Sequence, residues 1–132
     1  MKGLFCMLLL TLSGFAYGQQ GKLTVHIEFR GIEDGYDYMT KDELYVDDQL
    51  LQVTDEHMES QAIDVQINVP LGKHKLSVVN WTLYEGSWEK TTIENEYSID
   101  GFGEIQCNFK KKGKVSIVYD LDDQNSPLMN CK

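Results

Sequence analysis

Acidic side chains are concentrated in one loop-like stretch, residues 31–42, and the chemistry they could support is cation binding. Asp34, Asp37 and Asp42 are the carboxylates of this stretch that we single out as candidate calcium ligands. Hard cations such as Ca²⁺ take several oxygen ligands at about 2.3–2.6 Å, and Asp-rich loops supply them. The spacing does not match that of an EF-hand loop. The alternative interpretation is that these acids are solvated side chains of an acidic protein.

A second candidate site is an aromatic and acidic group formed by Tyr84, Glu85, Trp88 and Glu89. Exposed aromatic faces beside carboxylates can stack on sugar rings or anchor a protein partner. Trp81 lies on an apolar strand face and is expected in the core, whereas Trp88 lies in an expected loop and should be exposed. We therefore predict a ligand contact at Trp88 and its neighbours. The alternative is an exposed aromatic side chain with no binding role.

The sequence does not predict covalent catalysis. His26, His57 and His74 lie outside recognisable nucleophile motifs such as GxSxG, and no two of them have the ligand spacing of a helix or hairpin metal site. Two of the many acids could act on glycosidic bonds. A single small sandwich, however, seldom offers the deep cleft that such chemistry needs. We expect no catalytic residues and no cofactor, with calcium as the alternative to test.

Alternation of apolar and polar residues, the signature of β-strands, dominates the chain after residue 21. Within residues 22–29, for example, the side chains of Leu23, Val25, Ile27 and Phe29 fall on one face. Strands are expected at residues 22–29, 43–46, 50–53, 62–69, 74–84, 91–99, 104–109 and 114–121.

The connections between these strands indicate how they are arranged. Asp47-Asp48 is typical of a hairpin turn. Residues 74–84 are apolar on both faces, which indicates either a central strand covered on both sides or a β-bulge near Val79. The sequence predicts an all-β protein, a single antiparallel β-sandwich of about seven or eight strands, immunoglobulin-like or similar. The sandwich should occupy residues 19–121, followed by a polar, loose tail at residues 122–132.

The first eighteen residues have the pattern of a secretory signal peptide. Lys2 supplies a positive n-region, residues 4–12 form a short apolar core, and Ala16-Tyr17-Gly18 places small residues at the cleavage positions. The apolar run is shorter than the about 20 residues of a transmembrane helix, and no second run follows. We expect a secreted or periplasmic protein, cleaved near Gly18, without a transmembrane segment after cleavage.

Two cysteines remain after that cleavage, Cys107 and Cys131. In an oxidising compartment they could form a disulfide that ties the tail to a strand. The alternative is a buried Cys107 and a free Cys131, because sequence gives no distance. The formal net charge is −9, and the removal of Lys2 makes it one unit more negative. Such an acidic domain repels nucleic acid, so we expect a protein or glycan partner at the cell surface.

Two pieces of the chain resemble a PEGA-type domain, a small prealbumin-like β-sandwich of bacterial envelope proteins. ELYVDDQLL at residues 43–51 is similar to the "vYVDGk" hairpin of that family, and Pro70-x-Gly72-x-His74 followed by KLSVV is similar to its "P-x-G-x-H" turn and strand. The spacing between the two pieces is longer here by residues 54–60, and Glu85-Gly86-Ser87-Trp88 replaces the aromatic-glycine pair. The resemblance covers about a third of the chain and implies a fold and an envelope location, with no catalytic residues.

The sequence thus predicts a non-enzymatic binding module at the cell envelope or outside the cell. Its binding surface should be the loops at one end of the sandwich, around residues 34–42 and 85–89, with a sheet edge as a second way to take up a partner strand. The alternative is a calcium- or carbohydrate-binding accessory protein. The identity of the partner and the oligomeric state do not follow from the sequence.

Overall fold

The computed structural model describes residues 18–132. The predicted signal peptide lies outside the described residues except for Gly18, so its cleavage stays a prediction. Within residues 18–132 there is no helix long and apolar enough to cross a membrane.

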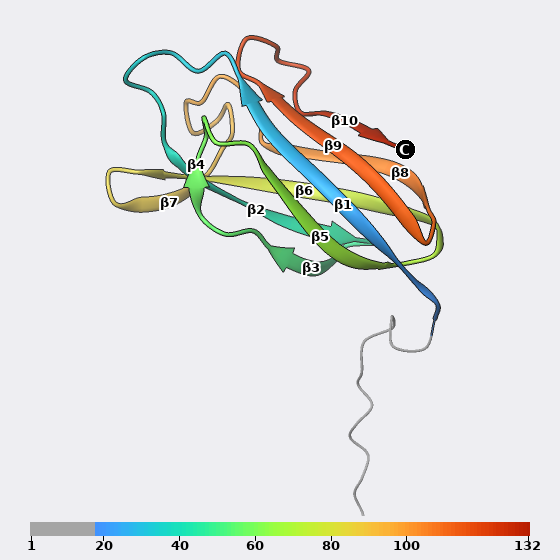
Figure 1. Cartoon of the computed structure of the whole chain (residues 1–132). Helices are drawn as coiled ribbons and strands as arrows, with labels where there is room; N and C mark the ends of the chain where they lie inside the picture. Colours follow the sequence, from blue (N-terminus) through green and yellow to red (C-terminus); the bar gives the residue numbers. More distant parts are fainter. Residues whose placement is uncertain (1–17) are drawn as a thin grey trace, which may run out of the picture.

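The described chain is all-β and folds into two facing sheets (Figure 1). The four-stranded sheet has the order β10 (Leu128–Cys131), β9 (Lys112–Asp120), β1 (Gln20–Arg30) and β5 (Ile63–Pro70). The six-stranded sheet has the order β3 (Gln49–Val53), β2 (Met39–Val46), β6 (Gly72–Tyr84) and β7 (Ser87–Lys90), with β4 (His57–Met58) also paired to β2 and β8 (Phe102–Phe109) also paired to β6. The predicted β-sandwich is consistent with this architecture.

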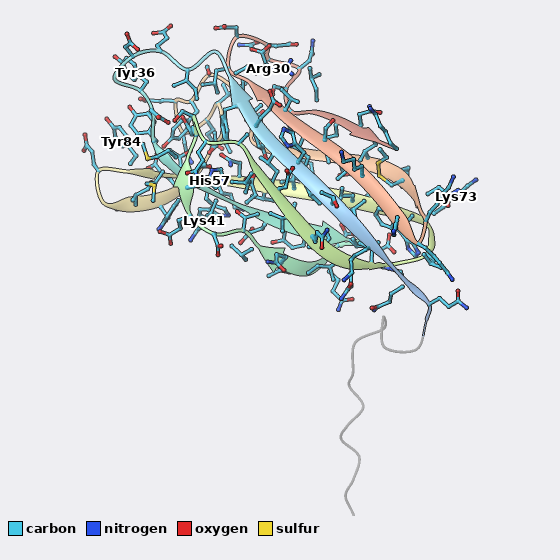
Figure 2. All side chains as sticks on the ribbon, in the orientation of Figure 1. Arg30, Tyr36, Lys41, His57, Lys73 and Tyr84 are labelled. Carbon is cyan, nitrogen blue, oxygen red and sulfur yellow. A yellow bond between two sulfur atoms is a disulfide. The ribbon has the colours of Figure 1, made fainter. Side chains whose placement is uncertain are left out.

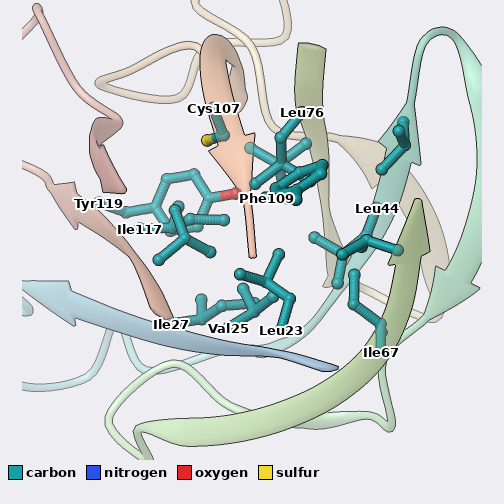
Figure 3. Close-up of a cluster of buried hydrophobic side chains, with 14 of the residues drawn as sticks. Leu23, Val25, Ile27, Leu44, Ile67, Leu76, Cys107, Phe109, Ile117 and Tyr119 are labelled. Carbon is teal, nitrogen blue, oxygen red and sulfur yellow. The ribbon is translucent and has the colours of Figure 1, made fainter. Parts of the chain in front are cut away.

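The core lies between the two sheets and is built by the alternation seen in the sequence. Leu23, Val25, Ile27 and Phe29 of β1 all point inward and are buried. Figure 3 shows Leu23, Val25 and Ile27 in one cluster with Leu76 of the opposite sheet. Burial of such side chains, worth about 1.5–3 kcal/mol each, is what drives the two sheets together.

Two tight turns of the six-stranded sheet use residues with positive φ. Asp47 and Asp48, with φ of 50° and 68°, connect β2 to β3, which confirms the predicted hairpin. Glu85 and Gly86, with φ of 50° and 84°, connect β6 to β7 in the same way. Turns of this kind match the twist of the paired strands. The second hairpin falls where the sequence predicted a loop.

Two predictions about the strands are wrong. The strand pairing is not wholly antiparallel, because β1 and β9 pair in parallel over residues 22–30 and 112–120. Residues 91–99 form a loop with turns instead of a strand.

For residues 74–84 the structure decides between the two predicted alternatives. β6 is a central strand, because it pairs with β2 along one edge and with β8 along the other. The alternative, a bulge near Val79, is not found in these pairings, and the register shift of this sheet lies between Leu44 and Tyr45 of β2 in its pairing with β3.

The C-terminal residues are also more ordered than predicted. Residues 128–131, expected in a loose tail, form β10 and pair with β9. A disulfide joins Cys107 of β8 to Cys131 of β10, as the first of the two sequence alternatives proposed. Because β8 and β10 belong to different sheets, this bond links the two layers of the sandwich covalently.

Candidate ligand-binding pocket

A cavity of about 470 Å³ opens at one end of the sandwich. Its walls come from the segments that follow β1, β4 and β9, from the end of β6, from β7 and from the loop at residues 91–98. Tyr36 and Tyr84, which both line it, lie at the same end of the molecule in Figure 2, whereas Lys73 lies at the other. This volume is in the range of small-molecule sites, about 300–1,000 Å³.

Tyrosine rings form much of the apolar lining, contributed by Tyr36, Tyr38, Tyr84 and Tyr97. The ring centroids of Tyr38 and Tyr84 are 5.8 Å apart with the planes at 71°, and those of Tyr36 and Tyr38 are 6.5 Å apart at 68°. These are edge-to-face contacts, the arrangement that aromatic quadrupoles favour. Tyr36 and Tyr84 are exposed, so their rings are accessible to a ligand.

Carboxylates supply the charge of the pocket, and they are Glu33, Glu59, Glu89, Glu96 and Asp122. Among the described residues that line the cavity there is no Lys, Arg or His. The phenol of Tyr97 donates a hydrogen bond to Oε1 of Glu89 at 2.7 Å. Burial, followed by this hydrogen bond to a carboxylate, raises the pKa of Tyr97, so the phenol keeps its proton.

Glu59 is the most buried of these carboxylates, with only 5 % of its surface exposed. Desolvation raises the pKa of its carboxyl to about 7, and the nearby charge of Asp37 acts in the same direction. A hydrogen bond from the backbone of Tyr38 opposes the shift. The backbone N–H of Glu59 in turn donates to the carbonyl of Tyr38 at 2.9 Å, which fixes the two residues side by side.

A buried polar network extends from the floor of the pocket into the core. The hydroxyl of Thr91, which lines the cavity, donates to Oδ1 of Asn80 at 2.6 Å. Nδ2 of Asn80 donates to Oδ1 of Asp42 at 3.0 Å, and the phenol of Tyr119 donates to the same oxygen at 2.7 Å. Asp42 is completely buried, and desolvation raises the pKa of its carboxyl to about 6 despite these hydrogen bonds.

The structure divides the predicted aromatic group between two faces of the β6–β7 hairpin. Tyr84 and Glu89 line the pocket, and Glu85 lies in the turn. Trp88 pairs with Leu83, so it lies on the opposite face from Tyr84, because side chains alternate along a strand. It is half-buried there, with Nζ of Lys41 at 4.2 Å from its ring centroid. Trp81, predicted in the core, is half-buried on the same outer face.

The candidate calcium ligands are placed in three different environments. Asp34 is exposed in the loop after β1, Asp37 accepts hydrogen bonds from the backbone and hydroxyl of Ser60, and Asp42 lies in the core. Across residues 18–132, no three His, Cys, Asp or Glu side chains are grouped so that they could hold a metal ion. Calcium binding by these acids stays a prediction that the arrangement of the described residues does not favour.

Among the pocket residues that the sequence did not identify as ligand contacts are Tyr36, Tyr38, Glu59 and Tyr97. They lie in three polar stretches far apart in the chain, and only the fold brings them together. The feature that the three stretches share is that each of them contains acidic side chains. That signal is weak, since acids and tyrosines are frequent in this chain.

No family model matches this chain, and a search of curated proteins finds no similar sequence. The resemblance to PEGA-type domains therefore stays a prediction. The two pieces that carry it do lie together, because Nδ1 of His74 is 2.6 Å from Oδ2 of Asp47 and the backbone N–H of Lys75 donates to Oδ1 of Asp47 at 3.0 Å.

Proposed function

We propose that this protein is a non-enzymatic binding module that takes up its ligand in the pocket at the end of the sandwich. The observation that supports the proposal is the pocket itself, a concave space lined by tyrosine rings and carboxylates. Such a lining provides apolar contact area, hydrogen-bond acceptors and a defined electrostatic potential. Binding would use shape, hydrogen bonding and charge, with no covalent step.

The module acts outside the cytoplasm under this proposal, as a secreted or periplasmic protein. The signal-peptide pattern of residues 1–18 motivates this location. The disulfide between Cys107 and Cys131 is compatible with it, because disulfides persist in oxidising compartments. The partner would be a protein or glycan at the cell surface, or a small molecule in that compartment.

Affinity capture from the envelope and secreted fractions of the source organism tests the proposal. The bait is the chain from residue 19, compared with the variants Tyr84→Ala and Trp88→Ala. These two residues belong to the same hairpin but to opposite faces of it. We expect one ligand to be retained by the wild-type chain and by Trp88→Ala, and to be lost from Tyr84→Ala.

Two results would contradict the proposal. Equal retention by all three chains would place the contact elsewhere, for example at a sheet edge. Loss from Trp88→Ala alone would place it on the outer face of the six-stranded sheet. Circular dichroism of both variants serves as the folding control, and both should retain the wild-type spectrum because neither side chain belongs to the buried core.

A further inference from the structure

We propose that the pocket is specific for an organic cation, a ligand with an ammonium, alkylammonium or guanidinium head group. This inference rests on the proposed binding function and adds the chemical class of the ligand. It follows from three features of the pocket: the sign of its charge, the orientation of its rings, and the spacing of its acids.

The charge of the pocket favours a cation. Five carboxylates line it, and its described lining contains no basic side chain. The basic side chains of this hairpin region are directed to the other face: Nζ of Lys41 lies over the ring of Trp88, and Nζ of Lys90 lies 5.7 Å from the ring centroid of Trp81. The part of the chain that the structure describes therefore supplies no counter-charge in the lining of the cavity. A cationic ligand would supply it, whereas an anion would be repelled.

The orientation of the rings distinguishes a cation from a sugar. A pyranose stacks on a flat aromatic platform, which requires an accessible ring face of sufficient area. Here the planes of Tyr38 and Tyr84 are inclined at 71°, and those of Tyr36 and Tyr38 at 68°. All three rings line the cavity, and under this proposal they act as adjacent, non-parallel walls of a cage. Cages of this type bind compact cations, because each ring face presents negative potential to the charge.

The spacing of the acids distinguishes an organic cation from a metal ion. A metal needs several donor atoms at about 2–2.6 Å from one point. In the described chain, no three acidic, histidine or cysteine side chains are gathered in this way. The acids instead lie around a cavity of about 470 Å³, which has room for an alkylammonium or guanidinium group and part of its chain.

Glu59 is the carboxylate best placed to recognise the charge. Its side chain is buried at the cavity wall, where the solvent screening of a charge pair is reduced. The groups that act on its carboxylate are the backbone of Tyr38 and the carboxylate of Asp37. Neither of these two groups carries a positive charge. A ligand cation would be the favourable partner of this carboxylate and would lower its pKa from about 7.

Calorimetric titration of the chain from residue 19 tests this inference. The probes are choline, spermidine, and lysine and arginine blocked at both ends, which distinguish a free small cation from a side chain of a partner protein. The decisive control is the uncharged isostere of choline, in which carbon replaces the quaternary nitrogen. Methyl glucoside and Ca²⁺ represent the competing ligand classes.

We expect at least one cationic probe to bind and the uncharged isostere to bind at least tenfold more weakly. Tyr84→Ala should lower the affinity for the cation by about 2-fold to 30-fold, the range of cation–π contributions. Glu59→Gln, which keeps the shape of the side chain, should also lower this affinity. Trp88→Ala should bind as the wild-type chain does, because its ring lies on the other face of the hairpin.

The proposal is overturned if no cationic probe binds up to about 10 mM, or if the isostere binds as tightly as choline. Binding of methyl glucoside that depends on Tyr84 would overturn the cation class and leave the proposed binding function intact. Equal binding by wild type, Tyr84→Ala and Glu59→Gln would remove the pocket as the binding site, and with it both proposals.

Discussion

Replacing Glu59 by Gln should make the free energy of unfolding less dependent on pH. The carboxyl of Glu59 has a pKa of about 7 in the folded protein, compared with 4.5 for an unperturbed glutamate. This difference in pKa arises first from desolvation, because only 5 % of the surface of Glu59 is exposed. Each unit of difference between the folded and unfolded pKa corresponds to about 1.4 kcal/mol. Ionisation of this buried group therefore lowers the free energy of unfolding by roughly 3 kcal/mol.

The folded state binds the proton of Glu59 more tightly than the unfolded state, and this sets the direction in which stability changes with pH. The stabilisation from the protonated carboxyl is therefore complete below a pH of 4.5. It decreases as the pH rises through about 7, where the folded protein ionises. Glutamine has no such titration. The variant should therefore gain stability relative to the wild type with increasing pH, by up to roughly 3 kcal/mol between about pH 4 and pH 9.

Urea unfolding of both chains, followed by tryptophan fluorescence, measures this difference at several pH values. The quantity to plot is the free energy of the variant minus that of the wild type, because Asp42 titrates in both chains and its contribution cancels. A difference that is the same at low and high pH would refute the reasoning. It would mean that the carboxylate of Glu59 is solvated in the folded protein.

Three further outcomes follow from the same structure, each measurable by urea unfolding. The free energy of unfolding of Asp42→Asn should rise by about 3 kcal/mol relative to that of the wild type as the pH rises through about 6. The reason is that the wild type loses the stabilisation by its protonated, fully buried carboxyl over that range. An equal effect at pH 4 and pH 8 would contradict this. Cys131→Ser should lose about 2–4 kcal/mol, because its bond to Cys107 closes a separation of 24 residues, and reduction of the wild type should reproduce that loss. Trp88→Ala should lower the free energy of unfolding by about 1–2 kcal/mol, because it removes the contact with Lys41 and some buried apolar area. A much larger decrease would show that Trp88 belongs to the core.

β1 is the clearest example of a strand that the sequence predicts correctly. Its buried residues alternate with exposed or half-buried ones along its whole length, so local periodicity was sufficient. The turn at Asp47-Asp48 was also predictable, since Asp tolerates positive φ. By contrast, the parallel pairing of β1 with β9 depends on residues about 90 positions apart, and strand periodicity contains no information about partners.

Residues 91–99 show why alternation alone can mislead. Ile93 and Ile99 are two of the apolar residues that favoured a strand, yet Ile93 is 45 % exposed while Ile99 is completely buried. Side chains satisfy the backbone here instead of a strand partner. Oγ1 of Thr92 accepts from the N–H of Asn95, and Oδ1 of Asp100 accepts from the N–H of Ile93. Such local hydrogen bonds compete with strand pairing, and they form the loop that carries Tyr97.

The candidate site was only partly predictable, for a related reason. The sequence predicts one group of aromatic side chains beside carboxylates, and two of its members, Tyr84 and Glu89, line the pocket. It includes Trp88 in that group because it predicts a loop at residues 85–89. As a strand, β7 turns every second side chain away, so Trp88 falls on the far side. Recognition of Glu85-Gly86 as a hairpin turn was the missing step.

The loop that forms part of the pocket wall is held to β6 by hydrogen bonds of both the backbone and the side chain of Asn80. The loop at residues 91–101 is attached to β6 through Asn80, whose N–H donates to the carbonyl of Gly101 at 2.8 Å and whose carbonyl accepts from the N–H of Thr91 at 3.0 Å. A Cβ at Gly101 would lie 2.7 Å from Cβ of Asn80, so only glycine permits this approach. A wall fixed in this way does not have to be ordered when a ligand binds, which reduces the entropic cost of binding. Buried Asp42, which costs stability when it ionises, thus belongs to the network that reaches the pocket through Asn80 and Thr91.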